Sequence, residues 1–404
     1  METEVVELHG HIIDSLTLPK VLDQILKSDG SFEIEEMRIG NRREDTSYAR
    51  IRVEAADQAV LTSILSTIKV QGAEMLHEKD AELAAVEQDG VFPEGFYVTT
   101  NLQTFVRLGG RWAPVQRPRM DCGIIVADDG TARTARFGHL KRGDNVVVGD
   151  AGVKVQPLDR PVAGRGVFEF MSSAVSAEKP KGALIAGIAR AMKATREEGK
   201  KIVLVGGPAI VHTGGARHIV ALIEKGYIDL LFAGNALAAH DIEAALVGTS
   251  LGVNIEEGTP SNEGHENHIR AINAVRRCGG IRQAVEQGLL TSGIMHACIK
   301  HDVDFVLAGS IRDDGPLPDV ITDVIVAQET MAQKVADAGL ALMIATGLHS
   351  IAVGNMLPAE TRTVVVDIEA SLVTKVADRG THQAVGLVSD VEPFLNELLA
   401  YFRD

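Results

Sequence analysis

Aromatic residues are scarce in this sequence. Phe, Trp and Tyr make up 4% of its 404 residues, whereas hydrophobic residues as a whole make up 45%. The cores must therefore be built from Val, Ile, Leu and Ala, which is typical of buried parallel strands and of the helices that cover them. A chain of this length is also long for a single core, so we expect two or three domains.

Cysteine and surplus basic charge are also lacking. The three cysteines, Cys122, Cys278 and Cys298, show no CxxC spacing, and an odd number cannot all pair. We expect free thiols in a reducing cytoplasm, and no nucleophile among them, because none has a visible histidine partner. The formal net charge of −15 argues against nucleic acid as a partner, since binding to phosphates depends on surplus Lys and Arg.

Long apolar runs are absent as well. No run approaches the ~18 residues that span a bilayer. The acidic start METEVVELHGHIIDS lacks the basic region and apolar core of a signal peptide. We therefore expect a soluble, cytoplasmic protein that has no membrane partner.

Residues 1–98 have the pattern of a small α+β domain. Apolar alternation predicts strands at 5–11, 32–38 and 48–53, with amphipathic helices between and after them. This order is that of the ferredoxin-like βαββαβ plan. His9 and His11 alternate with apolar residues on the first strand, and no third ligand is visible nearby, so we expect a solvated or structural role for them rather than metal binding.

Residues 99–178 have a different pattern. Short strand candidates are separated by turn sequences such as Gly109-Gly110 and Asp128-Asp129-Gly130, which predicts a small β-rich domain. The segment 111–121 holds three arginines and the only tryptophan. Arg117 and Arg119 are candidates to hold a substrate carboxylate bidentately; alternatively, they form surface salt bridges in an acidic protein.

Residues 179–404 are organised around the segment 201–236. An apolar run stops at Gly206-Gly207, an amphipathic helix follows a glycine-rich loop, and a second apolar run ends at Gly234-Asn235, which predicts a βαβ unit. Further apolar runs alternate with helices as far as the C-terminus. The region therefore predicts a doubly wound parallel sheet, as in a Rossmann-like domain.

Polar and glycine residues follow nearly every one of these strands, at the edge where open parallel sheets bind ligands. A carboxylate there can accept both hydroxyl hydrogens of a ribose diol, and the amides of a helix N-terminus can take a phosphate. Asp390 can alternatively be only a helix cap. We predict that a dinucleotide is bound by Asn235, Ala236, Asp314, Thr346, Gly347, Leu348, His349, Asp367, Asp390 and Val391.

Two resemblances follow from these segments. Residues 208–217, 231–235 and 299–315 resemble parts of the deoxyhypusine synthase fold, which binds NAD in this way. Over essentially its whole length, the chain resembles archaeal-type ornithine cyclodeaminase, which is also the C-terminal half of the cyanobacterial arginine-to-proline enzyme. The most specific segments are 91–101, 117–121, 206–209 and 310–319.

The second resemblance implies both an architecture and a reaction. The N-terminal region would be related to the conserved domain of lysine-oxoglutarate reductase/saccharopine dehydrogenase (LOR/SDH), and NAD would be tightly held. L-Ornithine would be converted to L-proline with loss of ammonia: a hydride leaves the α-carbon, the δ-amine closes the ring, and the same hydride returns. Because NAD folds of this type commonly associate, we also expect a homo-oligomer.

This reaction needs a base that takes a proton from the substrate α-ammonium. Lys300 is one candidate, because it comes just before a central strand and falls where the deoxyhypusine synthase fold carries its reactive lysine; it can equally be a helix C-terminal cation. Asp313 and Asp314 are the others, one to hold the ammonium and one to meet the cofactor. His265 and His268 are spaced i, i+3, but no third ligand is obvious, so we expect no metal.

Two other functions fit the same residues. One is an NAD-dependent amino-acid dehydrogenase or amine transferase, which would release reduced cofactor or a modified product. The other is a non-catalytic NAD-binding protein whose ferredoxin-like domain senses an amino acid. Net formation of reduced NAD with ornithine or lysine would favour the dehydrogenase or transferase. A protein that does not respond to any amino acid would favour the non-catalytic alternative.

Overall fold

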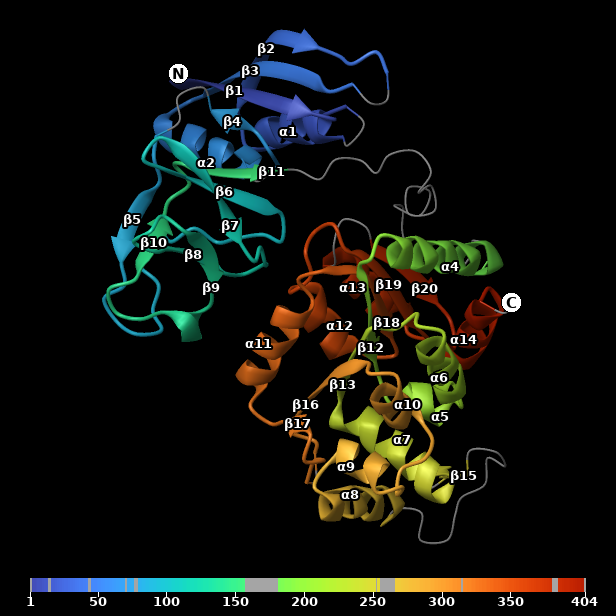
Figure 1. Ribbon diagram of the computed structural model, residues 1–404. Helices are drawn as coiled ribbons and strands as arrows, with labels where there is room; N and C mark the ends of the chain where they lie inside the picture. The colour runs from blue at the N-terminus through green and yellow to red at the C-terminus, as the bar shows by residue number, and fades with distance from the viewer. Residues whose placement is uncertain are drawn as a thin grey trace. The chain divides into compact units, whose positions relative to one another are not determined.

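The computed structural model forms two compact units, Met1–Gly164 and Arg165–Asp404 (Figure 1). The structure describes residues 2–13, 16–42, 45–69, 71–75, 79–156, 181–251, 253–254, 266–313, 315–379 and 384–402. Within these ranges, no helix is both long enough and apolar enough to cross a membrane.

The first unit begins with a four-stranded antiparallel sheet in the order β2-β3-β1-β4. Its elements are β1 (Glu2–Gly10), α1 (Thr17–Lys27), β2 (Ser31–Arg38), β3 (Ser47–Ala55), α2 (Gln58–Lys69) and β4 (Glu74–Met75). Every second residue of β3 is buried, as expected for a sheet that is covered on one face. The element order and the strand order confirm the ferredoxin-like prediction.

A seven-stranded sheet in the order β11-β6-β7-β9-β8-β10-β5 forms the rest of the described part of this unit. Its elements are β5 (Glu82–Ala85), β6 (Gln103–Leu108), β7 (Arg111–Gln116), β8 (Gly123–Val126), β9 (Ala132–Ala135), the 3-10 helix η1 (Phe137–His139), β10 (Asn145–Val148) and β11 (Val153–Gln156). Short strands and tight turns pack around two small apolar cores, which confirms the predicted β-rich fold. The sheet also takes in β5, which precedes residue 99 and pairs with β10.

The second unit contains a seven-stranded sheet in the order β17-β16-β13-β12-β18-β19-β20. Its strands are β12 (Lys201–Gly206), β13 (Leu230–Gly234), β16 (Asp304–Ala308), β17 (Val320–Ile321), β18 (Ala338–Ile344), β19 (Arg362–Asp367) and β20 (Ala384–Val388). All neighbouring pairs are parallel. The predicted doubly wound sheet is therefore confirmed, and its strand order reverses between β12 and β18.

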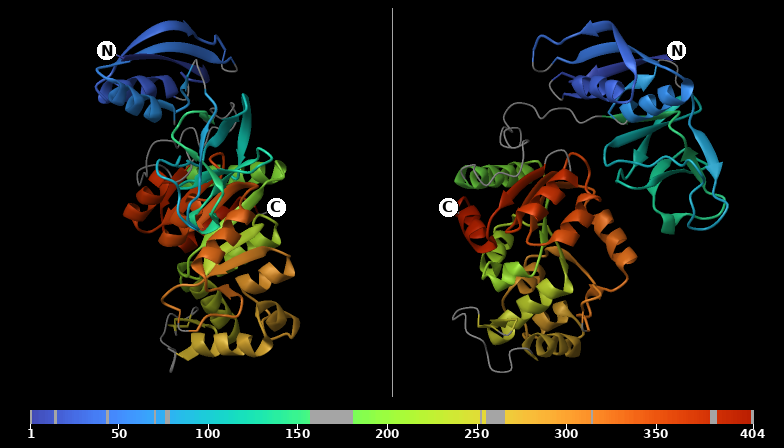
Figure 2. Two further views of the ribbon diagram at one scale, coloured as in Figure 1. Left: turned by 90° about the vertical axis from the view of Figure 1, so that its left-hand side faces the viewer. Right: turned by 180° about the vertical axis from the view of Figure 1, so that it is seen from behind.

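Helices cover both faces of this sheet (Figure 2). Each face of the sheet has its own apolar core, and alternate residues of β12 pack into the two cores. Ile202 and Leu204 belong to one core, and Val203 and Val205 belong to the other. The first face carries α4 (Lys181–Glu197), α5 (Ala209–His212), α6 (Ala216–Glu224), α7 (Asn235–Val247), α10 (Ile294–Lys300) and α14 (Val391–Ala400), with α8 (Asn267–Cys278) and α9 (Ile281–Glu286) packed beside them. The second face carries α11 (Val324–Lys334), α12 (Gly347–Gly354) and α13 (Ala370–Arg379). A short hairpin, β14 (Thr249–Ser250) and β15 (Val253–Asn254), follows α7.

Candidate functional site

The loops that follow β12 and β18 are in direct backbone contact where the strand order reverses. The amide of Gly207 donates to the carbonyl of Ile344 at 2.9 Å. An ideal Cβ on Gly207 would lie 1.7 Å from the carbonyl oxygen of Ala345, so only glycine fits there. Ala345 itself has a φ of 53°, a left-handed conformation that is uncommon outside glycine. Strained backbone of this kind is concentrated at functional sites, and here it lies at the switch point of the sheet.

The N-terminus of α12 follows Ala345 directly. Thr346 is extended, and its side chain makes no capping hydrogen bond, while the first turn of the helix contains no acidic residue. Gly347 begins the helix, and an added Cβ there would lie 2.8 Å from a methyl of Leu372. Leu348 is 79% exposed. The amides of this first turn therefore form a suitable site for a phosphate, helped by the helix dipole.

The junction between β13 and α7 also makes a structural contact. Gly234 is extended, and Asn235 is the first residue of α7, at the carboxyl edge of the sheet, with Ala236 next to it. The side-chain oxygen of Asn235 accepts a hydrogen bond from the amide of Leu317 at 3.0 Å. Asn235 thereby ties α7 to the segment that connects β16 with β17.

His349 lies where the loops after β13, β16 and β18 come together. A Cβ on Gly234 would be 3.2 Å from Cε1 of His349. Burial lowers the pKa of His349, and the charge of Asp313 partly opposes this shift. Asp313 is held in a tight turn, because its carboxylate accepts from the amide of Ser310 at 2.8 Å. A neutral imidazole and a carboxylate therefore share this part of the edge.

Two more carboxylates end the last strands of the sheet. Asp367 is 8% exposed, and its carboxylate accepts from the amide of Glu369 at 2.9 Å. Asp390 is exposed and precedes α14, but its side chain makes no capping hydrogen bond, so helix capping does not explain it. Val391 is 4% exposed, and its side chain belongs to the core.

Two predicted site residues of this unit are not among those described at the carboxyl edge of the sheet. Lys300 is exposed and ends α10, before β16 begins at Asp304. It therefore lies at the amino edge of the sheet, opposite to Asp313. Asp314 lies outside the described residues.

Arg117 and Arg119 belong to the first unit, in a loop with two left-handed residues, Arg117 and Asp121. The carbonyl of Arg117 accepts from the hydroxyl of Thr134 at 2.5 Å, and that of Arg119 accepts from the hydroxyl of Thr99 at 2.6 Å. The Arg117 side chain is exposed, whereas Arg119 is 5% exposed. The loop therefore has a fixed backbone and presents one open and one buried cation.

A buried polar cluster in the second unit was missed by the sequence reasoning. Nδ1 of His212 lies 2.6 Å from the hydroxyl of Ser250, and the His212 and His240 rings are 4.8 Å apart. Nδ1 of His240 lies 2.8 Å from the carboxylate of Glu243, which is fully buried. The only signal in the sequence was the i, i+3 spacing of His240 and Glu243, which together with Asp241 interrupt an otherwise apolar run from Ala236 to Val247. Within the described ranges, no group of three or more His, Cys, Asp or Glu side chains is arranged to hold a metal.

The cysteines are free in the structure. Cys122 and Cys298 are buried, and Cys278 is partly exposed. Burial raises the pKa of the Cys122 thiol and raises that of Cys298 to about 12. A protonated, buried thiol is a poor nucleophile, which agrees with the structural role expected for these two residues.

Three family models match the chain in sequence. Residues 3–102 match the LOR/SDH bifunctional enzyme conserved region. Residues 103–185 match the first region of the C-terminal part of arginine dihydrolase ArgZ-like proteins, and residues 186–398 match the Rossmann fold of the same part.

Relatives match over most or nearly all of the chain. The ornithine cyclodeaminase of Methanothermobacter thermautotrophicus is 54% identical over 99% of this chain and 97% of its own length. The crystal structure of a conserved LOR/SDH protein from Methanococcus maripaludis is 48% identical, covers 80% of this chain and 96% of its own, and gives a TM-score of 0.75. The ternary complex of AgrE with ornithine and NAD⁺ is 39% identical, covers 99% of this chain and 57% of its own, and gives a TM-score of 0.54. AgrE of Nostoc is a bifunctional arginine dihydrolase/ornithine cyclodeaminase.

Proposed function

The chain belongs to the ornithine cyclodeaminase family that carries the LOR/SDH conserved region, and we propose that it converts L-ornithine to L-proline and ammonia. When bound, NAD supplies the acceptor and then the donor of one hydride, so the reaction is redox-neutral overall. The observation that carries the proposal is the carboxyl edge of the parallel sheet, where the backbone contact of Gly207 with Ala345 lies beside the open N-terminus of α12. The relative AgrE has been crystallised with ornithine and NAD⁺ together.

The residues at this edge fit NAD. The amides of Gly347 and Leu348 would hold its phosphates, and Asp367 would accept the hydrogens of a ribose diol. We propose that the remaining contacts come from residues at or just beyond the other strand ends. They are Asn235, Ala236, Asp314, Thr346, His349, Asp390 and Val391.

We propose that the group that accepts a proton from the substrate α-ammonium lies at the sheet edge that holds Asp313 and His349. A neutral imidazole can accept a proton at Nδ1 or Nε2, and the lowered pKa of His349 keeps it neutral at physiological pH. Asp313, fixed by the amide of Ser310, can hold the substrate ammonium nearby. The position of Lys300 at the opposite edge gives no support to its predicted role as the base.

Arg117 and Arg119 remain our candidates for the substrate carboxylate. Their loop is kept rigid by Thr99 and Thr134, and rigid positioning is what ring closure of ornithine requires. The δ-amine attacks within the same molecule, so the protein accelerates the step mainly by holding both ends of the substrate in a reactive geometry.

The proposal is tested by incubating the purified protein with L-ornithine and following proline, ammonia and the absorbance of reduced nicotinamide. We expect proline and ammonia in equal amounts and no net reduced nicotinamide. Accumulation of reduced nicotinamide without proline would instead identify an amino-acid dehydrogenase. No turnover of any amino acid, with NAD bound, would favour the non-catalytic sensor.

We further propose three domains, at 1–98, 99–178 and 179–404, and a cytoplasmic homo-oligomer active in proline biosynthesis. The division into three is supported by the family matches, which change near residues 102 and 185. Large apolar side chains are exposed at the carboxyl edge of the sheet in the second unit, as expected for a surface that is covered in an assembly. They are Ile311, Val324, Ile325, Val326, Leu348 and Ile368. Size-exclusion chromatography with light scattering would give the mass of the assembly.

A further inference from the structure

We propose that the first unit contains a second binding site, for a free α-amino acid, in a cavity between its two sheets. The cavity has a volume of about 430 Å³, within the range of small-molecule sites. The N-terminal sheet contributes the end of β1, the start of α1 and Glu74 of β4, and the seven-stranded sheet contributes β6, β7 and β11. All lining residues belong to the first unit, so the inference does not depend on the catalytic assignment made for the second.

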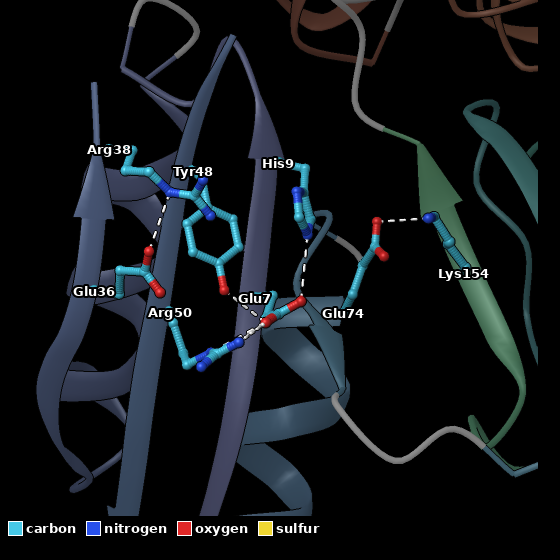
Figure 3. Close-up of polar contacts among 8 residues, drawn as sticks. All are labelled: Glu7, His9, Glu36, Arg38, Tyr48, Arg50, Glu74 and Lys154. Atoms are coloured by element: carbon cyan, nitrogen blue, oxygen red, sulfur yellow. Dashed lines mark hydrogen bonds and ion pairs between the residues drawn. The ribbon is translucent and has the colours of Figure 1, made fainter. Parts of the chain in front are cut away.

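The charges at the cavity wall are those that recognise a zwitterion. Glu74 and Lys154 both line the cavity, and their carboxylate and ammonium groups lie 2.6 Å apart (Figure 3). The two side chains are 26% and 30% exposed, so this pair of charges is only partly screened by water. An amino acid can place its carboxylate against Lys154 and its ammonium against Glu74, and thereby replace one ion pair with two.

The start of α1 strengthens the preference for a carboxylate. Thr17, its first residue, lines the same cavity. The first turn of α1 contains no acidic residue, and the N-cap residue Leu16 makes no side-chain capping hydrogen bond. The N-terminal end of this eleven-residue helix therefore lies at the cavity wall, where the helix dipole adds positive potential.

Glu7, a second carboxylate of the N-terminal sheet, is already neutralised within the protein. Glu7 accepts from the hydroxyl of Tyr48 at 2.6 Å and from the guanidinium of Arg50 at 2.8 Å, and it contacts His9 at 3.4 Å (Figure 3). Hydrogen bonds from Tyr48 and then Arg50 lower the pKa of Glu7 to about 2. Glu7 is thus engaged outside the cavity, and among the described lining residues Glu74 is the carboxylate that faces a ligand.

The rest of the cavity suits an amino-acid side chain. Phe105, Trp112, Ile12 and Val155 provide apolar contact area. An aromatic face can pack against an aliphatic side chain or attract a cationic one. Because the ion pair joins β4 to β11, a ligand bound there would connect the two sheets.

The tryptophan gives a direct test, because Trp112 is the only one in the chain. Each of the twenty L-amino acids and ornithine would be titrated into the full-length protein while Trp fluorescence is followed. We expect a saturable change with at least one of them, and at least a tenfold weaker response to its amide and to its N-acetyl derivative, which each lack one charge.

Variants complete the test. Lys154→Ala and Glu74→Gln should each weaken this binding at least tenfold, measured by fluorescence and by calorimetry. Lys141→Ala removes a surface ion pair of the same unit with Asp89 and should leave the affinity unchanged. Asp313→Asn should also leave it unchanged, which separates this site from the catalytic one. Absence of a response to every amino acid, or unchanged affinity in both cavity variants, would overturn the inference.

Discussion

The backbone of Gly207 contacts that of Ala345 so closely that no side chain fits between them: a Cβ at residue 207 would stand 1.7 Å from the Ala345 carbonyl oxygen. This contact joins the two central strands at the switch point of the sheet. We expect Gly207→Ala to force the two loops apart, which destabilises the second unit by about 1–3 kcal/mol and reduces NAD affinity at least tenfold.

Thermal unfolding and NAD titration would measure both effects. The matched control is Gly138→Ala, because a Cβ on Gly138 meets nothing within 4 Å. If Gly207→Ala bound NAD as tightly as the unmodified protein, the switch point would not be the cofactor site.

The carboxylate of Asp367 is the second test of the cofactor site. Asp367→Asn keeps an oxygen for the amide of Glu369 but removes the charge that would hold a ribose diol. A hydrogen bond to a charged group contributes about 1.5–3 kcal/mol, so we expect NAD to bind roughly ten to a hundred times more weakly. Asp337→Asn, which removes a surface ion pair with Lys201, serves as the control and should leave NAD binding unchanged.

His349 should carry the pH dependence of the reaction if it accepts the substrate proton. We expect His349→Gln to reduce kcat by about 10²- to 10⁴-fold, with a much smaller effect on the Kd of NAD. In the unmodified enzyme, kcat/KM should fall at acid pH as His349 becomes protonated, and this part of the profile should disappear in the variant. An unchanged acid limb in His349→Gln would assign the proton transfer to another group.

Much of the fold follows from local patterns in the sequence. Apolar runs that end in glycine or a polar residue define the parallel strands, and parallel strands bring their carboxyl ends to one edge. The proximity of Asn235, Thr346 and Asp367 to that edge was therefore predictable. The role of the Asn235 side chain was not, because its bond to Leu317 depends on how a distant loop packs.

Two further differences between the predictions and the structure also arise from topology and from packing between distant segments. Lys300 precedes a strand, and a residue before a parallel strand lies at the amino edge, so topology places it away from Asp313 in spite of the resemblance that suggested it. The contact of His212 with His240 arises from the packing of α5 against α7, and no local pattern encodes it. Only the polar residues within an apolar helix indicated that a polar cluster was buried there.

Thiol labelling of the folded protein should distinguish the three cysteines. Cys278 is partly exposed, whereas Cys122 and Cys298 are buried with raised pKa values. A disulfide reagent should therefore titrate one thiol rapidly in the native protein and three after unfolding in denaturant. Cys278→Ser should abolish the rapid reaction. Rapid labelling of a second thiol would show that one of the buried cysteines is accessible.

The contact of the partly buried His212 with the buried His240 makes the stability of the second unit depend on pH. Burial, and then the proximity of His240, lower the pKa of His212 from 6.5 to about 4, while the charge of Glu243 opposes the shift. Between these two values, the unfolded chain binds a proton that the folded chain does not. The stability contributed by neutral His212 is therefore complete above about pH 6.5 and is lost progressively as the pH falls toward 4. The loss is on the order of 2–3 kcal/mol.

Urea unfolding followed by circular dichroism from pH 7.5 to 4 would measure this loss. We expect His212→Gln to be less stable than the unmodified protein at neutral pH but to lose less stability on acidification, because glutamine does not titrate. His301→Gln, which changes an exposed histidine of the same unit, should reproduce the unmodified pH dependence. Parallel curves for His212→Gln and the unmodified protein would contradict the prediction, and would show that His212 stays neutral or charged to the same extent in both the folded and unfolded states.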